Sequence, residues 1–366
     1  MTTNGFIFAL CVSLGFGLLF TPLVRGVAIR WNLCDKPNGR TCRGIAHIGG
    51  VAIIGAIIFT LIPIFLFYLP PDQLHRAFVP ILIASGFLVF ILGIIDDLRS
   101  LHYLYKFCLQ VVVSLFVAFF GYALLERFGL VHLRLYLVLP TCFGVAIWML
   151  LVTTSFNLID GLDGLASGLT LIAAASFAIA GYLAGQGLIV ALSLVLFGAV
   201  LGFLRYNFPP AKIFMGDSGS LFLGLLFGLI SLLSLVSGGR LFFVMAGNVV
   251  VLSVPLLDTV LAFARRVLAR RPVMEADHRH IHHMLFFRLR SVVKADLVLW
   301  ALAAVFGCLG VLTMRGNVGA LVAAIALEVA VFACALAAMV RIELPADVEA
   351  EISAGSGITA SRASSR

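Results

Sequence analysis

Residues 156–168 read FNLIDGLDGLASG, and they separate two strongly apolar runs, 135–152 and 169–183. Ionisable side chains at the depth of a membrane are costly and are usually functional. Glycines permit a backbone that bends or approaches a ligand closely. The plainer interpretation is a pair of Asp-Gly turns that connect two helices. Three further polar segments on the same side of the expected membrane favour the functional interpretation.

The composition excludes a soluble protein of this length. Of the 366 residues, 62% are hydrophobic and only 11% are charged, and the mean hydropathy is +1.14. Apolar runs of about 18 or more residues recur, and each is long enough to cross about 30 Å of hydrocarbon as a helix. The backbone in lipid must satisfy its own hydrogen bonds, and the runs lack the period-two alternation of barrel strands. We therefore expect an all-α integral membrane protein, built as a polytopic helical bundle.

Eleven membrane spans are expected from the apolar runs. They cover residues 5–27, 48–68, 77–95, 107–126, 135–153, 168–184, 188–204, 220–236, 242–263, 296–313 and 318–340. We expect one polytopic domain over residues 1–345. Residues 346–366 are rich in Ser, Ala and Gly with mixed charge, which is typical of a disordered tail.

Lys and Arg are distributed unequally between the two sides of the expected membrane. Eleven spans place 19 of the 25 Lys and Arg residues on one side, and the positive-inside rule makes that side cytoplasmic. No basic residue precedes the first apolar run, so the N-terminus is expected outside and the C-terminus in the cytoplasm. The net charge of +8 therefore indicates contact with membrane lipid head groups and an anionic substrate, rather than with nucleic acid.

A second polar segment closes the third expected span with Asp96 and Asp97, and Lys106 follows it. Adjacent carboxylates repel each other and suit a metal-phosphate site or a general base. Lys106 is the nearest cation that can balance a phosphate. The alternatives are a solvated helix end for the two carboxylates and an interfacial, snorkelling side chain for the lysine.

The third polar segment reads FMGDSGS at 214–220 and leads into the eighth span. A carboxylate at a helix N-terminus acts as a cap, which is one interpretation of Asp217. The functional interpretation is an oxygen ligand for Mg²⁺. This ion takes one or two protein oxygens and leaves its other positions to water and substrate phosphate.

The fourth polar segment contains DHRHIHH at 277–283, so four of the eight histidines fall within six residues. A zinc or nickel site is one interpretation, although no Cys is close and the spacing differs from that of a helix-borne zinc pair. A basic loop attracted to anionic lipid is the second. Recognition of a pyrophosphate by imidazole and guanidinium donors is the third and the one we favour.

Together the four segments offer several carboxylates, an amide, a lysine and a histidine cluster on one membrane face. This inventory suits metal-assisted phosphoryl transfer, in which the protein positions the reactants and neutralises charge. Because the site borders the lipid, we expect one reactant to be a lipid phosphate.

Four motifs, in this order, resemble the polyprenyl-phosphate N-acetylhexosamine-1-phosphate transferases, which form glycosyltransferase family 4. The motifs are DD at 96–97, NLIDGLDGLASG at 157–168, FMGDSGS at 214–220 and HIHH at 280–283. The resemblance extends over about residues 35–300. HIHH preceded by Asp277 is similar to the undecaprenyl-phosphate α-N-acetylglucosaminyl 1-phosphate transferase branch, whereas the muramoyl-pentapeptide branch would show a run of three histidines.

The resemblance implies a role for each motif residue. Asp217 would be the chief Mg²⁺ ligand with Asn157 as the second, and Mn²⁺ is the alternative ion. The residues implied in catalysis are Asp96 as the candidate base, Asp97 beside the lipid phosphate, Lys106 on phosphate, and His280, His282 and His283 near the sugar phosphate. The residues implied in nucleotide-sugar binding are Asp160, Asp163 nearer the uracil, Gly164 and Arg265.

The implied activity is transfer of N-acetylglucosamine 1-phosphate from UDP-N-acetylglucosamine (UDP-GlcNAc) to undecaprenyl phosphate, with release of UMP. This reaction is the first membrane step of a cell-surface glycan such as O-antigen. The resemblance implies a multi-pass enzyme of the bacterial inner membrane with a cytoplasmic active site, and it suggests a homodimer. Direct attack of the lipid phosphate and a two-step route through a phosphorylated aspartate are both open. Another UDP-2-acetamido sugar and the muramoyl-pentapeptide substrate are the alternative donors.

Other membrane proteins fit these residues less well. A secondary transporter would hold its ionisable residues near the midplane on broken helices, whereas here they cluster at one face. A prenyltransferase would show DDxxD, but residues 96–100 read DDLRS, and a CDP-alcohol phosphotransferase would not show DGLDGL at 160–165. A scaffold without activity is the remaining alternative. Residues 40–47, RTCRGIAH, are shorter than the family loop, which leaves the roles of Arg43 and His47 open.

Overall fold

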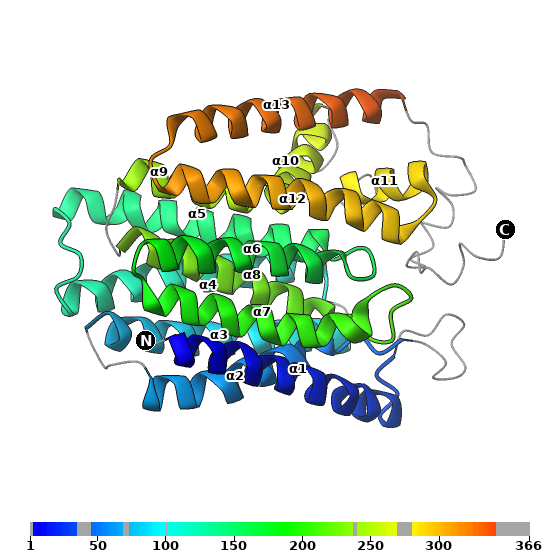
Figure 1. Cartoon of the computed structure of the whole chain (residues 1–366), viewed down its shortest axis with the longest axis horizontal. Coiled ribbons are helices and arrows are strands. Elements are labelled where there is room, and N and C mark those ends of the chain that lie inside the picture. Colours follow the sequence, from blue (N-terminus) through cyan, green and yellow to red (C-terminus); the bar gives the residue numbers. More distant parts are fainter. Residues whose placement is uncertain are drawn as a thin grey trace.

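The computed structural model describes residues 3–34, 45–68, 73–99, 101–236, 240–268 and 280–341, and these ranges contain thirteen α-helices (Figure 1). The helices are α1 Thr3–Arg30, α2 Gly49–Phe67, α3 Gln73–Arg99, α4 Tyr103–Arg127, α5 Leu135–Ile159, α6 Leu165–Leu183, α7 Gly187–Asn207, α8 Gly216–Val236, α9 Leu241–Val251, α10 Ser253–Leu268, α11 Ile281–Leu289, α12 Val292–Met314 and α13 Val318–Arg341. Most of them run alongside one another, and α11 lies at the end opposite to the start of α1 (Figure 1).

Ten of these helices are long and apolar enough to cross a membrane. Helices α9 and α10 form a pair bent by 76°, which is either one broken span or a re-entrant loop. The described part of the chain therefore confirms the expected polytopic all-α bundle and ten of its eleven expected spans. The span expected at 242–263, which corresponds to this bent pair, stays a prediction. The bend lies at Leu252, because Pro255 near the start of α10 has no N–H to donate to the carbonyl of Val251. Beyond the bend, α10 carries Asp258 and Arg265 into the polar end of the bundle.

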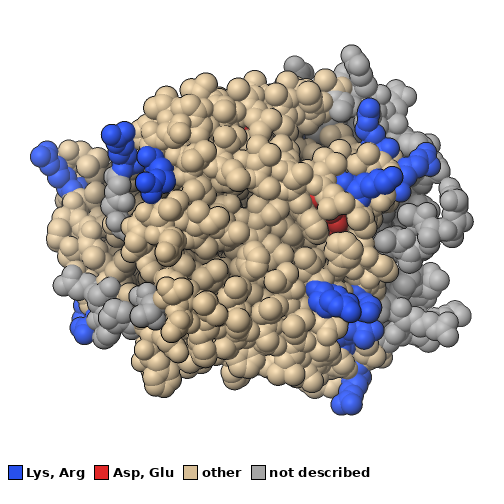
Figure 2. Space-filling model, in the orientation of Figure 1, with Lys and Arg blue, Asp and Glu red and all other residues tan. Residues whose placement is uncertain are grey.

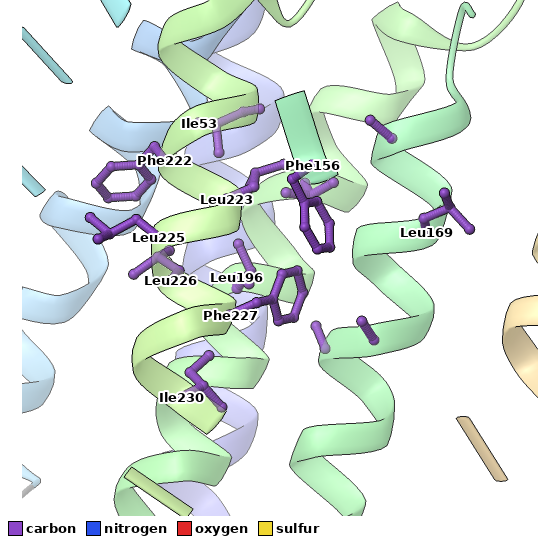
Figure 3. Packing of buried hydrophobic residues seen from close by; sticks show 14 of the residues in the cluster. Ile53, Phe156, Leu169, Leu196, Phe222, Leu223, Leu225, Leu226, Phe227 and Ile230 are labelled. Carbon is purple, nitrogen blue, oxygen red and sulfur yellow. The ribbon is translucent and has the colours of Figure 1, made fainter. Parts of the chain in front are cut away.

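Helix α8 is the centre of the bundle and packs against α2, α3 and α5. In its most apolar 18 residues 83% are buried, compared with 11% in α13, so α8 is shielded from lipid while α13 is peripheral. Large side chains from α5, α7 and α8 fill the space around it, among them Phe156, Leu196 and Phe227 (Figure 3). Phe156 and Phe227 stack with ring centroids 4.9 Å apart, a geometry that adds about 1 kcal/mol to the burial of the two rings.

Helix α3 meets the first turn of α8 at very short range, because residue 93 is glycine. A β-carbon on Gly93 would overlap the backbone of Asp217 and Ser218. Close approach at a small residue is a common way for membrane helices to pack. Asp96 and Asp97 follow one turn later on α3, so this approach brings both carboxylates to the N-terminus of α8.

Lys and Arg side chains gather at the two ends of the face shown in Figure 2, and a broad band without them separates the ends. A band of this kind is expected where the middle of a protein faces lipid tails. The expected tail, residues 346–366, lies outside the described residues, and the division into residues 1–345 and a tail stays a prediction.

Candidate active site

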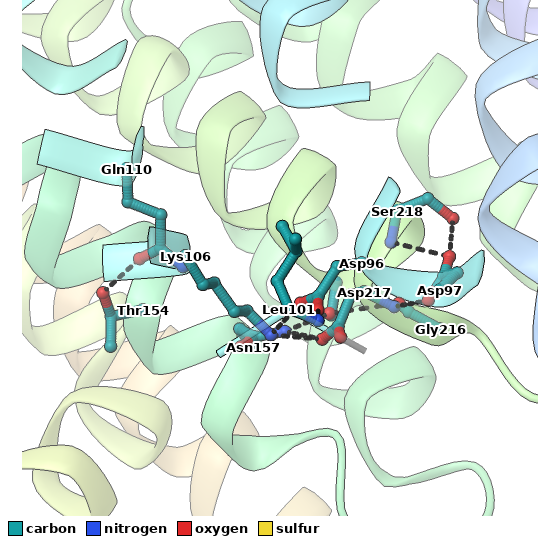
Figure 4. A network of polar contacts seen from close by, with 11 residues as sticks. Asp96, Asp97, Leu101, Lys106, Gln110, Thr154, Asn157, Gly216, Asp217 and Ser218 are labelled. Carbon is teal, nitrogen blue, oxygen red and sulfur yellow. Dashed lines mark hydrogen bonds and ion pairs between the residues drawn. The ribbon is translucent and has the colours of Figure 1, made fainter. Parts of the chain in front are cut away.

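Asp97, which lies on the neighbouring helix α3, caps the N-terminus of α8. Its Oδ1 accepts a hydrogen bond from the N–H of Asp217 at 2.6 Å, and its Oδ2 accepts from the N–H and the hydroxyl of Ser218 at 3.1 and 2.6 Å (Figure 4). The N–H groups at a helix start have no partner within the helix and favour a carboxylate. The main-chain carbonyl of Asp97 also lies 2.8 Å from Nε2 of His47. The cap of α8 is therefore Asp97, and the Asp217 carboxylate is available to other polar groups.

Lys106, in the first turn of α4, forms ion pairs with carboxylates from two other helices. Its Nζ lies 2.8 Å from Oδ2 of Asp96 and 2.7 Å from Oδ1 of Asp217. Asp96 also accepts a hydrogen bond from the N–H of Leu101 at 2.8 Å. The Lys106 side chain is only 19% exposed, so these ion pairs are partly shielded from water and are stronger than surface pairs. The lysine therefore faces the carboxylates and not the lipid interface.

Asn157, in the last turn of α5, joins the same group. Its amide nitrogen donates to Oδ1 of Asp217 at 2.5 Å and to the hydroxyl of Ser220 at 2.9 Å. The Asp217 carboxylate thus accepts hydrogen bonds from two helices besides its own (Figure 4). We call these five residues the carboxylate cluster: Asp96, Asp97, Lys106, Asn157 and Asp217.

The turn between α5 and α6 holds two aspartates beside this cluster. Gly164 ends the turn with φ of +82°, a conformation that other residues rarely adopt. Asp163 accepts a hydrogen bond from a main-chain N–H of the α7–α8 connection at 3.0 Å, and burial raises the pKa of its carboxyl. Burial and the nearby charges of Asp217 and Asp97 raise the pKa of Asp160 to about 8. Asp160 is therefore protonated at neutral pH when no cation lies beside it.

Three histidines lie beside α10. Nδ1 of His280 is 2.8 Å from Oδ2 of Asp258, whose Oδ1 accepts a hydrogen bond from the N–H of Ile281 at 2.6 Å. Nδ1 of His282 is 3.4 Å from the same Oδ2, and the ring centroids of His282 and His283 are 4.2 Å apart. We call Asp258, His280, His282 and His283 the histidine cluster.

The histidine cluster reaches the α5–α6 turn. A β-carbon on Gly161 would come 2.5 Å from Nε2 of His282, so this imidazole touches the turn that carries Asp160 and Asp163. Asp160 in turn lies within electrostatic range of Asp217. The structure therefore brings both clusters and the turn into one region at one end of the bundle, although all of these residues except Asp258 come from four separate polar segments of the sequence.

The sequence patterns do not single out Asp258, which stands alone in the apolar run 242–263. The available signal is that an ionisable side chain within a membrane span is itself a functional candidate. Asp296 on α12 is a second case: it is 1% exposed, and both of its oxygens lack a hydrogen-bond partner among the described residues. Arg265 is half-buried in the last turn of α10, and its role stays a prediction.

Two groups offer ligands for a cation. Asp217 and Asn157 supply a carboxylate and an amide oxygen, which suit Mg²⁺. Asp258, His280 and His282 have ligand atoms that all lie within 4.8 Å of one another. However, the 2.8 Å distance from Nδ1 of His280 to Oδ2 of Asp258 is that of a hydrogen bond between the two side chains. We therefore assign the second group a hydrogen-bonding role.

Fold and site together define a class of protein. The chain is a polytopic membrane protein, and one end of its bundle gathers carboxylates, a lysine and histidines. Such a combination of a partly buried ammonium, hard oxygen ligands and imidazoles can bind phosphate groups together with a divalent cation. The class indicated is a membrane enzyme that acts on phosphorylated substrates.

Comparison with known proteins identifies the family. The profile described as glycosyl transferase family 4 matches residues 79–235, a range that contains the whole carboxylate cluster. The chain is 35% identical over 308 residues to the "Probable undecaprenyl-phosphate N-acetylglucosaminyl 1-phosphate transferase" of Bacillus subtilis, which covers 81% of this chain and 82% of the relative.

Two further relatives extend the comparison. The chain is 32% identical over 337 residues to the decaprenyl-phosphate N-acetylglucosaminephosphotransferase of Mycolicibacterium smegmatis, covering 85% of this chain and 83% of that protein. It is 30% identical over 303 residues to a phospho-N-acetylmuramoyl-pentapeptide-transferase of Clostridium botulinum, covering 78% and 89%. The chain belongs to glycosyl transferase family 4 and is a phosphoglycosyl transferase, which confirms the resemblance carried by its four motifs.

Proposed function

We propose that this enzyme transfers N-acetylglucosamine 1-phosphate from UDP-GlcNAc to undecaprenyl phosphate, giving undecaprenyl-pyrophosphoryl-GlcNAc and UMP. The observation that carries the proposal is Lys106, whose ammonium lies 2.8 and 2.7 Å from the carboxylates of Asp96 and Asp217. This arrangement suits a phosphate group and its counter-ion. The names of the Bacillus and Mycolicibacterium relatives support N-acetylglucosamine as the sugar. The product would begin a cell-surface glycan such as O-antigen or a related polymer.

Asp217 and Asn157 are the residues that would hold Mg²⁺, with Mn²⁺ as the alternative ion. The Lys106 ammonium lies 2.7 Å from Oδ1 of Asp217, so this oxygen already binds a cation. The cluster contains three carboxyl groups and one ammonium, and this excess of acidic oxygens fits a divalent ion. When bound, the ion would neutralise charge on the pyrophosphate of the donor.

The chemistry that we propose is a single displacement. An oxygen of undecaprenyl phosphate attacks the β-phosphorus of UDP-GlcNAc, the bond from that phosphorus to the bridging oxygen breaks, and UMP leaves with the electron pair. A phosphate monoester has a second pKa of about 6 and is largely dianionic at neutral pH. The base role implied for Asp96 is therefore secondary, and Lys106 acts by orienting phosphate and balancing its charge.

The hydrogen bonds of the aspartates favour this direct attack over a phosphorylated aspartate. A nucleophilic carboxylate needs an oxygen that is free to reach phosphorus. Asp97 has both oxygens bonded to the start of α8. Asp96 has one oxygen paired with Lys106 and the other bonded to the N–H of Leu101.

We assign the site to the cytoplasmic side of the bacterial inner membrane, with the N-terminus outside and the C-terminus inside. The loops expected on this side contain 19 of the 25 Lys and Arg residues, which supports the orientation through the positive-inside rule. The bacterial origin of the relatives supports a bacterial membrane as the location.

The test is transfer by the purified protein in detergent with undecaprenyl phosphate, Mg²⁺ and a panel of UDP-sugars. We expect one UMP to be released for each lipid-linked sugar phosphate formed, with UDP-GlcNAc as the preferred donor. Preference for UDP-N-acetylgalactosamine or UDP-N-acetylmuramoyl-pentapeptide would replace the proposed donor. UMP release without a lipid product would contradict the proposed reaction itself.

A further inference from the structure

Asp258 contacts one short segment at three points. The side chain is 1% exposed on α10, and its Oδ1 accepts the N–H of Ile281 at 2.6 Å. Its Oδ2 lies 2.8 Å from Nδ1 of His280 and 3.4 Å from Nδ1 of His282. The two imidazoles are stacked, with centroids 5.3 Å apart and planes inclined by 19°. One carboxylate therefore faces the Nδ1 side of both rings.

The opposite side of the His282 ring faces the α5–α6 turn. Both ring nitrogens of His282 are buried and neither has a hydrogen-bond partner among the described residues, Nδ1 being 3.4 Å from Oδ2 of Asp258. Nε2 is also the atom that a β-carbon on Gly161 would meet at 2.5 Å. Gly161, against which this nitrogen lies, is itself exposed. A buried polar atom without a partner is costly unless a ligand supplies one.

The Asp258 carboxylate also decides which nitrogen of His282 carries the proton. A neutral imidazole has one N–H, and an ionised carboxylate accepts hydrogen bonds but cannot donate one. Because burial lowers the pKa of His282, the ring is neutral near pH 7. Its proton is then favoured on Nδ1, beside the carboxylate, and the lone pair lies on Nε2.

We propose that Asp258 is a positioning residue that orients His282 so that the Nε2 lone pair accepts a hydrogen bond from a hydroxyl or N–H group of the nucleotide sugar. The inference rests on the proposed function and makes it more specific. A nitrogen with a lone pair cannot donate to a phosphate oxygen, so His282 meets a hydrogen-bond donor of the sugar or ribose. The phosphates are left to the carboxylate cluster.

A double-mutant cycle tests whether Asp258 acts through His282. The kcat/KM for the nucleotide sugar is measured for the unaltered protein, D258N, H282A and the double variant. We expect D258N to lower kcat/KM by about 10- to 100-fold, and the double variant to match H282A within about twofold. If D258N lowers kcat/KM by the same factor with and without His282, Asp258 acts elsewhere and the inference is overturned.

A matched control separates this effect from a general loss of packing around α10. Glu328 on α13 also bonds to α10, where its carboxylate accepts the hydroxyl of Ser253 at 2.5 Å. E328Q therefore removes a second carboxylate charge that contacts α10, away from the histidine cluster. We expect its kcat/KM to stay within about twofold of the unaltered protein, as for substitutions outside a shared network. A loss equal to that of D258N would overturn the inference.

A spectroscopic measurement tests the inference without a donor or a folded D258N. The unaltered protein labelled with ¹⁵N-histidine reports the tautomer of each ring, and the His282 signals are those absent from H282A. We expect neutral His282 to carry its proton on Nδ1 at pH 7, and a proton on Nε2 would overturn the inference. Absence of UMP release with every UDP-sugar would instead refute the proposed function and leave the tautomer result standing.

Discussion

The carboxylate cluster and the histidine cluster lie at the same end of the bundle but are built differently. In the first, side chains from α3, α4, α5 and α8 bond to one another, with Lys106 between Asp96 and Asp217. In the second, the carboxylate of Asp258 bonds to His280 and to the N–H of Ile281. It lies 3.4 Å from Nδ1 of His282, and neither ring nitrogen of His282 has a hydrogen-bond partner among the described residues. The first region is a network of charges, whereas the second leaves the ring nitrogens of His282 without hydrogen-bond partners among the described residues.

The difference between the two clusters indicates that they bind different parts of the substrates. A network of charges suits phosphate and a cation, whereas an unfilled hydrogen bond suits a neutral polar group of the ligand. Removing one charge from a partly buried network leaves its partners uncompensated, which costs more than removing one neutral hydrogen bond. Substitutions of Lys106 and of the carboxylate of Asp217 should therefore lose more activity than substitutions in the histidine cluster.

The largest effect is expected for Asp217→Ala. This change removes the carboxylate that binds Lys106 and Asn157 and that is the proposed chief ligand of Mg²⁺. We expect turnover to fall by about 10²- to 10³-fold or more, measured as UMP release at saturating Mg²⁺. Asp217→Asn, which keeps the shape without the charge, is the matched variant. Near-normal product formation by folded D217A would remove Asp217 from the metal site.

Lys106→Gln should have the next largest effect. Without the ammonium, Asp96 and Asp217 lack the cation that now lies within 2.8 Å of both, and the substrate phosphate loses its nearest positive charge. We expect kcat to fall by about 10²-fold. Lys106→Arg should recover only part of the loss, because a planar guanidinium does not replace a compact ammonium. If K106Q turns over normally while D217A does not, the cluster does not act as one network.

Asp97→Asn should affect stability more than chemistry, because both Asp97 oxygens bond to the start of α8. An asparagine has one acceptor oxygen, so at least one donor at this helix end would lose its partner, at a cost of about 1–3 kcal/mol. The measurement is the thermal midpoint in detergent. Asp96→Asn is the control, since it leaves the cap of α8 intact and should lower the midpoint less. The reverse order would show that Asp97 is not the cap of α8.

Sequence reasoning reaches the carboxylate cluster because Asp96, Asp97, Asn157 and Asp217 each interrupt apolar runs at the ends of spans. Alternation of eleven spans then assigns all of these ends to one side of the membrane. The contacts between these side chains could not be predicted from the sequence. Asp97 caps α8 only because Gly93 lets the backbones of α3 and α8 approach each other closely. The spacing of residues in the sequence does not predict which helices pack this closely.

The place of Asp258 in the site could not be predicted from the sequence for a different reason. It is a single acidic residue in the run 242–263, and its partners come from residues 280–282 after a sharp bend in the span. The ten spanning helices could be predicted from apolar length alone, whereas the 76° bend between α9 and α10 depends on Pro255 and on how α10 packs. The catalytic and binding roles of the site residues stay predictions, since they depend on ligands.

The last expected effect, that of Asp160→Asn on stability, depends on pH. Burial and the charges of Asp217 and Asp97 raise the pKa of Asp160 from 3.8 to about 8. In metal-free buffer the unfolded chain ionises this carboxyl above about pH 4, whereas the folded protein keeps it protonated up to about pH 8. The carboxyl therefore costs the folded state stability as pH rises through this window, and an asparagine does not.

We accordingly expect the thermal midpoint of D160N, relative to the unaltered protein, to rise by a few degrees between pH 5 and pH 8 when EDTA is present. Mg²⁺ should reduce this gain, because a divalent ion beside Asp217 favours the ionised form of Asp160 and lowers its pKa. A midpoint difference that is the same at every pH would mean that the negative charge of the carboxylate cluster does not reach the α5–α6 turn. The two parts of the site would then be electrostatically independent.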